Sequence, residues 1–228
     1  MKIEKDWIML RKSIILLAIA LFIIRLNEVQ GQIVKDADGN AYPSVSIGKQ
    51  IWMAENLKTT KFNDGTPIAL VTADKAWKTV TTPAYCWLNN DLNNKDVYGA
   101  LYNWFTVDTK KLCPKGWHVP TDAEWSTMIT FLGDIRVAGD KLKETGDAHW
   151  KNTLDIGTNE FGFTALPAGM RQYTGVFPVF AKSYAVFWSS TQSAKELAWN
   201  RGLYFSTSNV YKGSEGKNCG FSVRCIKD

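Results

Sequence analysis

The sequence predicts an α+β domain, because three kinds of pattern follow one another along the chain. Short apolar runs separated by turn dipeptides open the domain at residues 32–57. The middle carries two stretches with helical spacing, and the last third returns to short aromatic or β-branched runs divided by Gly, Ser, Asn and Pro. Helices in the middle with strands on both sides are typical of the α+β class.

The first 31 residues are predicted to be a signal peptide. A basic segment at residues 2–12 precedes an apolar run at 14–24. That run is shorter than the roughly 20 residues a transmembrane helix needs, and it fits a signal peptide cleaved before Gln32. An uncleaved membrane anchor is the alternative, because Arg25 directly follows the run. We expect residues 32–228 to be one exported domain, located outside the cell, on its surface or in the periplasm.

The charge pattern excludes nucleic acid as the partner. The leader carries five Lys/Arg and three Asp/Glu, so the remainder keeps 22 basic and 19 acidic residues, a net charge of +3. The basic residues are scattered singly among acids and form no stripe that would neutralise a phosphate backbone.

Two turn dipeptides, Asp38-Gly39 and Gly48-Lys49, predict β-hairpins at the start of the domain. Asp36 and Asp38 do not form a calcium loop of the EF-hand type. That pattern needs a glycine at its sixth position and a glutamate at its twelfth, and Gly39 falls at the fourth. We therefore interpret the segment as a turn and expect no metal there.

The first predicted helix covers residues 96–107. Its apolar residues recur at helical spacing, despite Gly99, and are expected to lie in the core: Tyr98, Leu101, Tyr102 and Phe105.

The second predicted helix begins after Thr121. Thr121 and Glu124 form a capping box, in which each side chain binds a backbone N–H at the other's position. An apolar stripe follows, with Gly133 as the stop: Trp125, Met128, Ile129 and Leu132. His118, just before this helix, is interpreted as a half-buried, hydrogen-bonded imidazole. The histidine and carboxylates at residues 113–125 are therefore structural, not catalytic.

Residues 134–160 show no sustained period and predict a long irregular surface excursion. Strands are expected after it, within residues 161–172, 185–191, 197–213 and 220–228. In the last of these, Phe221, Val223 and Cys225 share one face, and Ser222, Arg224 and Lys227 belong to the polar side.

The four cysteines, at positions 86, 113, 219 and 225, are an even number in an exported chain, where disulfides are expected. Zinc is not expected. No CxxC pair is present, and neither His118 nor His149 has a second histidine at helical spacing.

Several segments occur in the order found in a known family: YGALYNW, CPKGWHVPTDAEW, NEFGFTALPAGMR, FWSST and GFSVRCIKD among them. Together they resemble the Fibrobacter succinogenes major paralogous domain, a family of exported bacterial proteins, over residues 34–228. The resemblance implies a C-type-lectin-like fold, related to that of formylglycine-generating enzymes, and it implies no enzymatic activity.

The resemblance also implies a disulfide between Cys113 and Cys225, which would join the start of the second helix to the last strand. Members of the family often pair the cysteine that matches Cys86 with one shortly after it, which is missing here. We therefore expect the second bridge to join Cys86 to Cys219, leaving no free thiol.

The leading functional hypothesis is a non-enzymatic binding or adhesion module of a bacterial cell envelope, with a protein partner or a structural surface role. The alternative is a calcium-independent carbohydrate-binding module. The candidate ligand-binding residues are Trp199, Asn200, Arg201, Tyr204 and Tyr211. Arg201 stands where the calcium-dependent lectins have a carboxylate, so calcium-mediated sugar binding is not expected.

An enzyme is the second alternative. An oxidase of the formylglycine-generating type needs reactive cysteines near the C-terminus, and the expected disulfides leave no thiolate. A glycoside hydrolase needs two carboxylates across a cleft, and nothing singles out such a pair. We expect no catalytic residue and no cofactor.

Overall fold

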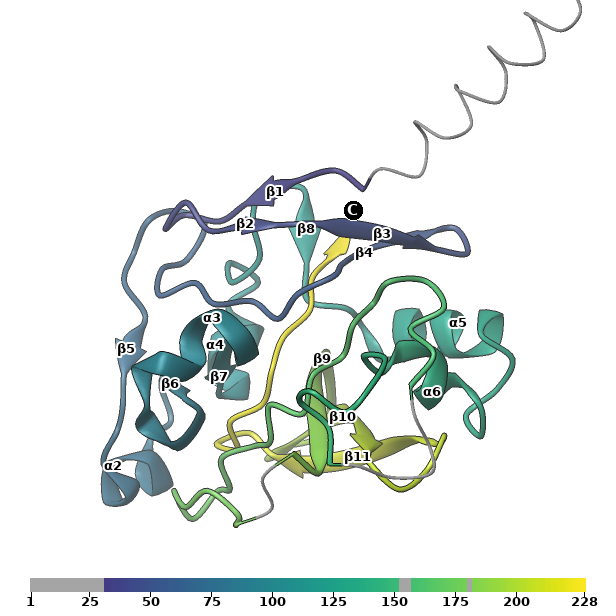
Figure 1. The fold of residues 1–228 in the computed structure, drawn as a ribbon. Coiled ribbons are helices and arrows are strands. Elements are labelled where there is room, and N and C mark those ends of the chain that lie inside the picture. Colours follow the sequence, from purple (N-terminus) through teal and green to yellow (C-terminus); the bar gives the residue numbers. More distant parts are fainter. Residues whose placement is uncertain (1–30, 152–156, 180–181) are drawn as a thin grey trace, which may run out of the picture. The chain divides into compact units, whose positions relative to one another are not determined.

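A computed structural model describes residues 31–151, 157–179 and 182–228. The predicted signal peptide, apart from its last residue, lies outside the described part of the chain. None of the helices in the described ranges is long and apolar enough to cross a membrane. In the unit Ile33–Asp228 the strands form small, mostly antiparallel sheets beside short helices, which confirms the α+β class (Figure 1).

Both predicted hairpins are confirmed. β1 (Val34–Lys35) pairs with β2 (Ala41–Tyr42), and β3 (Ser44–Ile47) pairs with β4 (Gln50–Met53), both antiparallel. The Asp36 carboxylate closes the first turn: it accepts from the backbone N–H of Asp38 and Asn40 at 2.9 Å each and from the Tyr42 hydroxyl at 2.6 Å. Asp36 therefore serves the turn, as predicted, whereas the Asp38 carboxylate accepts from the Thr60 N–H and pairs with Lys61.

The predicted helix over residues 96–107 is wrong. The chain forms α3 (Lys95–Tyr98), then β7 (Ala100–Tyr102), then α4 (Trp104–Asp108), which is capped by Asn103. Gly99 ends α3 with a φ of 72°, and a Cβ there would lie 2.8 Å from the Leu57 carbonyl oxygen. The close approach of that neighbouring segment requires a glycine and prevents a continuous helix.

The rest of this part of the chain forms a small sheet in the order β5-β6-β7. β5 (Ala69–Leu70) is parallel to β6 (Ala84–Trp87), and α2 (Asp74–Thr79) connects them. Two short 3-10 helices, η1 (Leu88–Asn90) and η2 (Leu92–Asn94), lead from β6 to α3.

The predicted capped helix is confirmed as α5 (Asp122–Phe131). Both halves of the capping box are formed, since Thr121 accepts from the Glu124 N–H and Glu124 accepts from the Thr121 N–H. Trp125, Met128 and Ile129 are buried on its inner face. In the described part of the excursion, residues 134–151 and 157–160, the one helix is α6 (Ala138–Leu142), which sequence reasoning missed.

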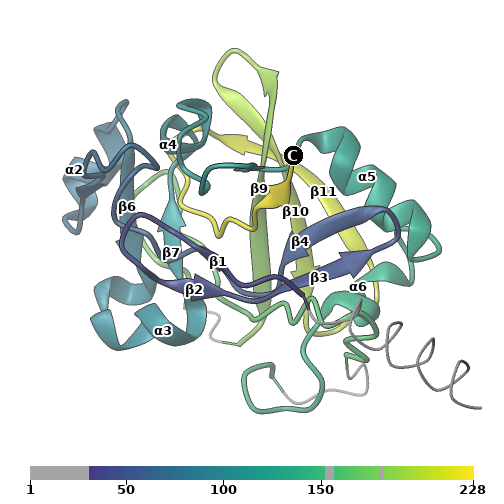
Figure 2. The same cartoon turned by 90° about the horizontal axis from the view of Figure 1, so that it is seen from above.

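A three-stranded antiparallel sheet in the order β11-β10-β9 lies at the bottom of the view in Figure 1, on the side of the unit away from β1–β4 (see also Figure 2). Its strands are β9 (Tyr184–Ala194), β10 (Leu197–Tyr204) and β11 (Val210–Gly216). The side chains of β9 alternate between two apolar cores: Tyr184, Val186 and Trp188 enter one, and Ala185 and Phe187 enter the other. The expected strand at 161–172 forms only isolated bridges.

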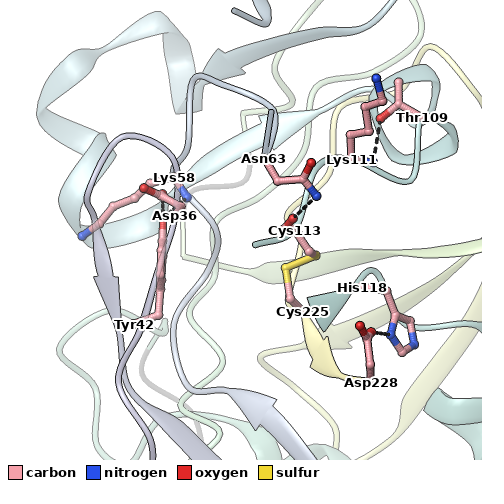
Figure 3. The surroundings of a disulfide bond; sticks show 10 residues. All are labelled: Asp36, Tyr42, Lys58, Asn63, Thr109, Lys111, Cys113, His118, Cys225 and Asp228. Atoms are coloured by element: carbon pink, nitrogen blue, oxygen red, sulfur yellow. Dashed lines mark hydrogen bonds and ion pairs between the residues drawn. A yellow bond between two sulfur atoms is a disulfide. The ribbon is translucent and has the colours of Figure 1, made fainter. Parts of the chain in front are cut away.

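The chain after β11 runs back through the middle of the unit to β12 (Ile226–Lys227), which lies between β4 and β8 (Trp117–His118). There the predicted Cys113–Cys225 disulfide is formed, with Cα atoms 6.0 Å apart (Figure 3). The Asn63 side-chain amide donates to the Cys113 carbonyl at 3.0 Å. The Met53 backbone N–H donates to the Cys225 carbonyl at 2.9 Å. The bond therefore fastens the last strand to the first half of the domain.

Arg224 does not lie on an exposed polar side, contrary to expectation. It is 1% exposed, and its guanidinium donates to the Asn56 side chain at 2.6 Å and to the Phe163 and Thr164 carbonyls at 2.5 and 2.9 Å. It also stacks 4.5 Å from the Phe163 ring centroid. Residues 221–226 are therefore buried on both faces. On the polar face, the Arg224 guanidinium satisfies acceptors from several distant loops.

His118 is hydrogen-bonded and partly exposed, as predicted. Its Nδ1 lies 2.6 Å from Asp228 and its Nε2 lies 2.9 Å from Glu124. Partial burial acts to lower its pKa, but the hydrogen bonds to Asp228 and Glu124 prevail and raise the pKa above the ordinary 6.5. Burial acts to raise the pKa of Glu124, but hydrogen bonds from Thr121 and His118 prevail and hold it below the ordinary 4.5.

These two shifts predict a pH window for the stability that His118 provides. The imidazolium stabilises the fold fully below pH 6.5 and loses its effect as the pH rises through the raised pKa. The Glu124 carboxylate contributes above pH 4.5 and loses its effect as the pH falls. The urea midpoint of His118→Gln should therefore lie furthest below wild type at about pH 5.5 and approach it at about pH 8.5. An equal difference at both pH values would contradict this assignment.

Candidate binding site

Two adjacent hollows lie where β9 begins and β10 ends. One has a volume of about 480 Å³ and the other about 390 Å³. Met170, Pro178 and Tyr184 line both, so these three side chains form a shared divider. Most of the lining is apolar, which is typical of ligand-binding hollows of this size.

A tyrosine cluster stands at the rim of the larger hollow. Tyr184 pairs with Tyr204 across the sheet, and Tyr211 pairs with Gly202. The Tyr204 ring centroid lies 6.2 Å from that of Tyr184 and 5.0 Å from that of Tyr211, the latter pair edge to face. Gly202 makes this possible, because the Tyr204 ring lies across it: a Cβ at Gly202 would come within 3.3 Å of the ring.

The hydroxyls of this cluster are available to a ligand. None of the three hydroxyls has a hydrogen-bond partner among the residues that the structure describes. Burial, and then the neighbouring Tyr204, raise the pKa of Tyr184 to about 12. Burial, followed by Tyr211 and Glu215, likewise raises the pKa of Tyr204. Both hydroxyls therefore stay protonated near neutral pH and can donate hydrogen bonds.

Arg171 holds the loop that walls both hollows. It is 0% exposed, and its guanidinium donates to the carbonyls of Gly175, Val71 and Thr72 at 2.6 Å each. It also pairs with Asp74 at 3.0 Å. These bonds cross-link the loop around residues 170–178 to the chain before α2, so the walls are fixed by a buried fork of charged hydrogen bonds.

The turn between β10 and β11 is fixed in a similar way. Lys143 is 1% exposed; its ammonium group pairs with Asp140 at 2.8 Å and donates to the Thr207 carbonyl at 3.2 Å. The Ser208 hydroxyl also donates to Asp140. The tyrosine cluster is thus carried by a sheet end that is bound to α6.

Two amide side chains face the hollows with unused donors. Asn89 lines the smaller hollow, is exposed and has no partner among the described residues. Gln172 lines the larger one, and in the described part of the chain its side chain bonds only through the oxygen, which accepts from Thr174 at 3.5 Å. Asn89 and Asn90 both have a φ of 55°, a left-handed conformation that asparagine tolerates better than most residues.

The structure brings together only part of the predicted ligand-binding set. Tyr204 and Tyr211 lie in the cluster described above. Trp199 and Arg201 point to the opposite face of the sheet, where Arg201 is 2% exposed and pairs with Asp122 at 2.7 Å. Trp199 lies under the Lys212 ammonium group, which is 4.0 Å from its ring centroid. Arg201 thus joins the sheet to α5, and neither side chain lines the hollows.

Asn200 shares the face of Tyr204 but is buried, at 4% exposure. Its side-chain oxygen lies against Gly213, where a Cβ would come within 2.6 Å. Sequence reasoning missed Tyr184, Met170 and Gln172. Tyr184 had a signal, because Tyr184, Val186 and Trp188 alternate as strand residues do.

The expected Cys86–Cys219 bridge is wrong, and so is the expectation of no free thiol. Both cysteines are free and buried. They lie in different apolar clusters, Cys86 with Trp77 and Leu101, and Cys219 in the larger core. Burial raises the pKa of each thiol to about 12, so neither is a thiolate near neutral pH. Among the described residues, no group of three or more His, Cys, Asp or Glu is placed to hold a metal ion.

The family described as Fibrobacter succinogenes major domain matches residues 45–227, a range that contains both hollows and the disulfide. No curated protein and no solved structure matches the chain.

Proposed function

Because the chain belongs to the Fibrobacter succinogenes major domain family, we propose that it is an exported, non-enzymatic binding or adhesion module of a bacterial cell envelope. Its ligand is a protein at the envelope surface, bound at the two hollows. The observation that carries the proposal is the tyrosine cluster, whose three hydroxyls have no hydrogen-bond partner among the described residues. Tyr184 and Tyr204 line an apolar hollow of about 480 Å³, and Tyr211 packs against Tyr204 beside it.

Tyrosine in this setting suits protein recognition. Its ring supplies a large apolar contact with little conformational entropy to lose, and its hydroxyl replaces the hydrogen bonds that a partner gives up. Here the rings are held by neighbouring rings and by the sheet, and the facing loop is held by Arg171. A surface built in this way is preorganised, which reduces the cost of ordering on binding.

The expected C-type-lectin-like arrangement is part of this proposal. Its support is the disulfide, which joins the segment before α5 to the last strand, as the family resemblance implies. The absence of a thiolate among the described cysteines supports the non-enzymatic role over an oxidase of the formylglycine-generating type, because Cys225 is bonded and Cys219 is 3% exposed.

Calcium-independent carbohydrate binding is the second candidate. The Tyr204 side chain lies over Gly202 and stays 39% exposed, so part of its ring face is open to stacking by a sugar ring. Arg201 supports independence from calcium, since it is buried and already paired with Asp122.

Binding of the labelled protein to bacterial cell envelopes tests both candidates. Protease treatment of the envelopes should abolish binding, whereas periodate oxidation of their glycans and addition of a chelator should not. The double variant Tyr204→Ala/Tyr211→Ala should bind about tenfold more weakly or worse, because truncating rigid aromatic anchors costs about 2 kcal/mol or more.

Phe131→Ala is the control, because Phe131 is an aromatic residue of α5 that is 52% exposed and lines neither of the two hollows. Binding that survives protease but is lost on periodate treatment would favour the carbohydrate candidate. Undiminished binding of the double variant would refute the site.

A further inference from the structure

The two hollows share an electrostatic feature that the proposed function does not use. Their described lining contains no Asp or Glu, whereas Lys151 lines the larger hollow and Lys182 the smaller. Neither ammonium group pairs with a carboxylate among the described residues: that of Lys182 donates to the Ala148 carbonyl at 2.9 Å, and that of Lys151 lies 5.1 Å from the Phe205 ring centroid.

The two lysines are also adjacent in space. The Lys151 backbone N–H donates to the Lys182 carbonyl at 2.8 Å, which joins their chain segments. Some lysines elsewhere in the described unit pair with acids, as Lys111 does with Asp64 at 3.0 Å. These two ammonium groups form no ion pair with a described carboxylate, so an acidic group on a ligand can pair with them. Glu144 and Glu215 act on Tyr98 and Tyr204 of the lining without pairing with either lysine.

The shape of the site adds a second constraint. Met170, Pro178 and Tyr184 divide it into two apolar hollows in a row. In an extended peptide every second side chain points to the same side, about 6–7 Å apart. Recognition of extended peptides commonly uses such successive hollows for side chains, with polar groups beside them for the backbone. The tyrosine hydroxyls, Asn89 and Gln172 are polar groups of this kind.

We propose that the site binds an extended peptide segment that places apolar side chains in the two hollows and a carboxylate beside Lys151 and Lys182. This inference rests on the proposed function and specifies its ligand. An acidic polysaccharide fits less well, because Tyr184, which lines both hollows, is only 6% exposed and so offers little surface on which a sugar ring could stack. Sugar hydroxyls would also lose hydration against Met170 and Pro178.

Fluorescence anisotropy with three labelled peptide pools tests the charge. Each pool contains random decapeptides of Leu, Val and Pro together with one further residue, which is Glu, Gln or Lys. The Glu pool should bind wild type about tenfold more tightly than the Gln pool, since two ion pairs near a surface contribute about 1–2 kcal/mol. The Lys pool should bind most weakly, and added salt should reduce the difference between pools.

Charge reversal tests the residues. Lys151→Glu/Lys182→Glu should reverse the order, so that the Lys pool binds best. Lys49→Glu/Lys75→Glu is the matched control: it changes the net charge equally at two exposed lysines that line neither hollow, and the wild-type order should persist. Circular dichroism of each variant establishes that it is folded.

The outcomes separate this inference from the proposed function. Equal binding of all three pools, abolished by Tyr204→Ala/Tyr211→Ala, would overturn the acidic preference and leave the site in place. Displacement of the label by oligogalacturonate but not by excess unlabelled Glu pool would overturn the peptide in favour of an acidic glycan. No binding of any pool or of oligogalacturonate would overturn the inference, and the envelope experiment would then decide the proposed function by itself.

Discussion

Removal of the Cys113–Cys225 bond should lower the free energy of unfolding by about 5 kcal/mol. The bond closes a loop with a sequence separation of 112, and the chain-entropy estimate for a loop of about 100 residues is about 4.7 kcal/mol. Domains of this kind are stable by about 5–15 kcal/mol in total. The double variant Cys113→Ala/Cys225→Ala is therefore expected to be marginally folded or unfolded at 37 °C.

The free cysteines provide the control. Cys86→Ala/Cys219→Ala removes two buried sulfur atoms but no covalent bond, so it should cost only the lost packing, about 1–3 kcal/mol. Urea denaturation with and without reductant measures both variants. Reductant should shift the wild-type midpoint toward that of Cys113→Ala/Cys225→Ala and leave the midpoint of that variant unchanged. A wild-type midpoint that does not move when mass spectrometry shows the bond reduced would contradict the estimate.

Substitution of Arg224 should have the next largest effect. Arg224→Leu keeps an apolar side chain over the Phe163 ring but leaves the Asn56 side chain and the Phe163 and Thr164 carbonyls without their donor. Burial lowers the pKa of Arg224 to about 9, so the guanidinium is charged at neutral pH and its hydrogen bonds are charge-assisted. We expect a loss of about 3–5 kcal/mol, because several buried acceptors are left unsatisfied at once.

Arg136→Leu is the matched control, because Arg136 is exposed and pairs with Asp134, two residues away. Its cost should be within about 0.5 kcal/mol, as for most exposed ion pairs. Arg224→Lys should remain clearly destabilised, since an ammonium group cannot reproduce the planar fork. Equal urea midpoints for Arg224→Leu and Arg136→Leu would show that the buried network contributes little.

A structural feature could be predicted from the sequence when the residues that cause it lie close together along the chain. The capping box of α5 was predicted correctly, because Thr121 and Glu124 lie three residues apart and interact through the backbone of one turn. Residues 96–107 were misread, because the reason for the break is a contact of Gly99 with Leu57, far away in the sequence. Arg224 was misplaced for the same reason, since its partner Asn56 lies 168 positions away.

In the candidate site, too, local sequence patterns identified some residues, and long-range contacts determined the rest. Tyr204 and Tyr211 were identified from one stretch of sequence, but so were Trp199 and Arg201, which the sheet turns to its other face. Tyr184 and Met170 enter the site only through the pairing of β9 with β10 and the position of the loop around residues 170–178. Those depend on Arg171 and Asp74, whose contact spans 97 positions and leaves no local pattern.

The disulfide also determines how the domain would carry mechanical load. If tension acts between Ile33 and Asp228, the covalent path runs from Ile33 to Cys113, across the sulfur atoms and from Cys225 onward. The segment between Cys113 and Cys225 bears no force, so roughly 380 Å of chain, at about 3.4 Å per residue, cannot be extended while the bond is intact. That segment contains Tyr184, Tyr204 and Tyr211, so stretching would peel away the N-terminal hairpins while the tyrosine-bearing sheet stays outside the line of pull.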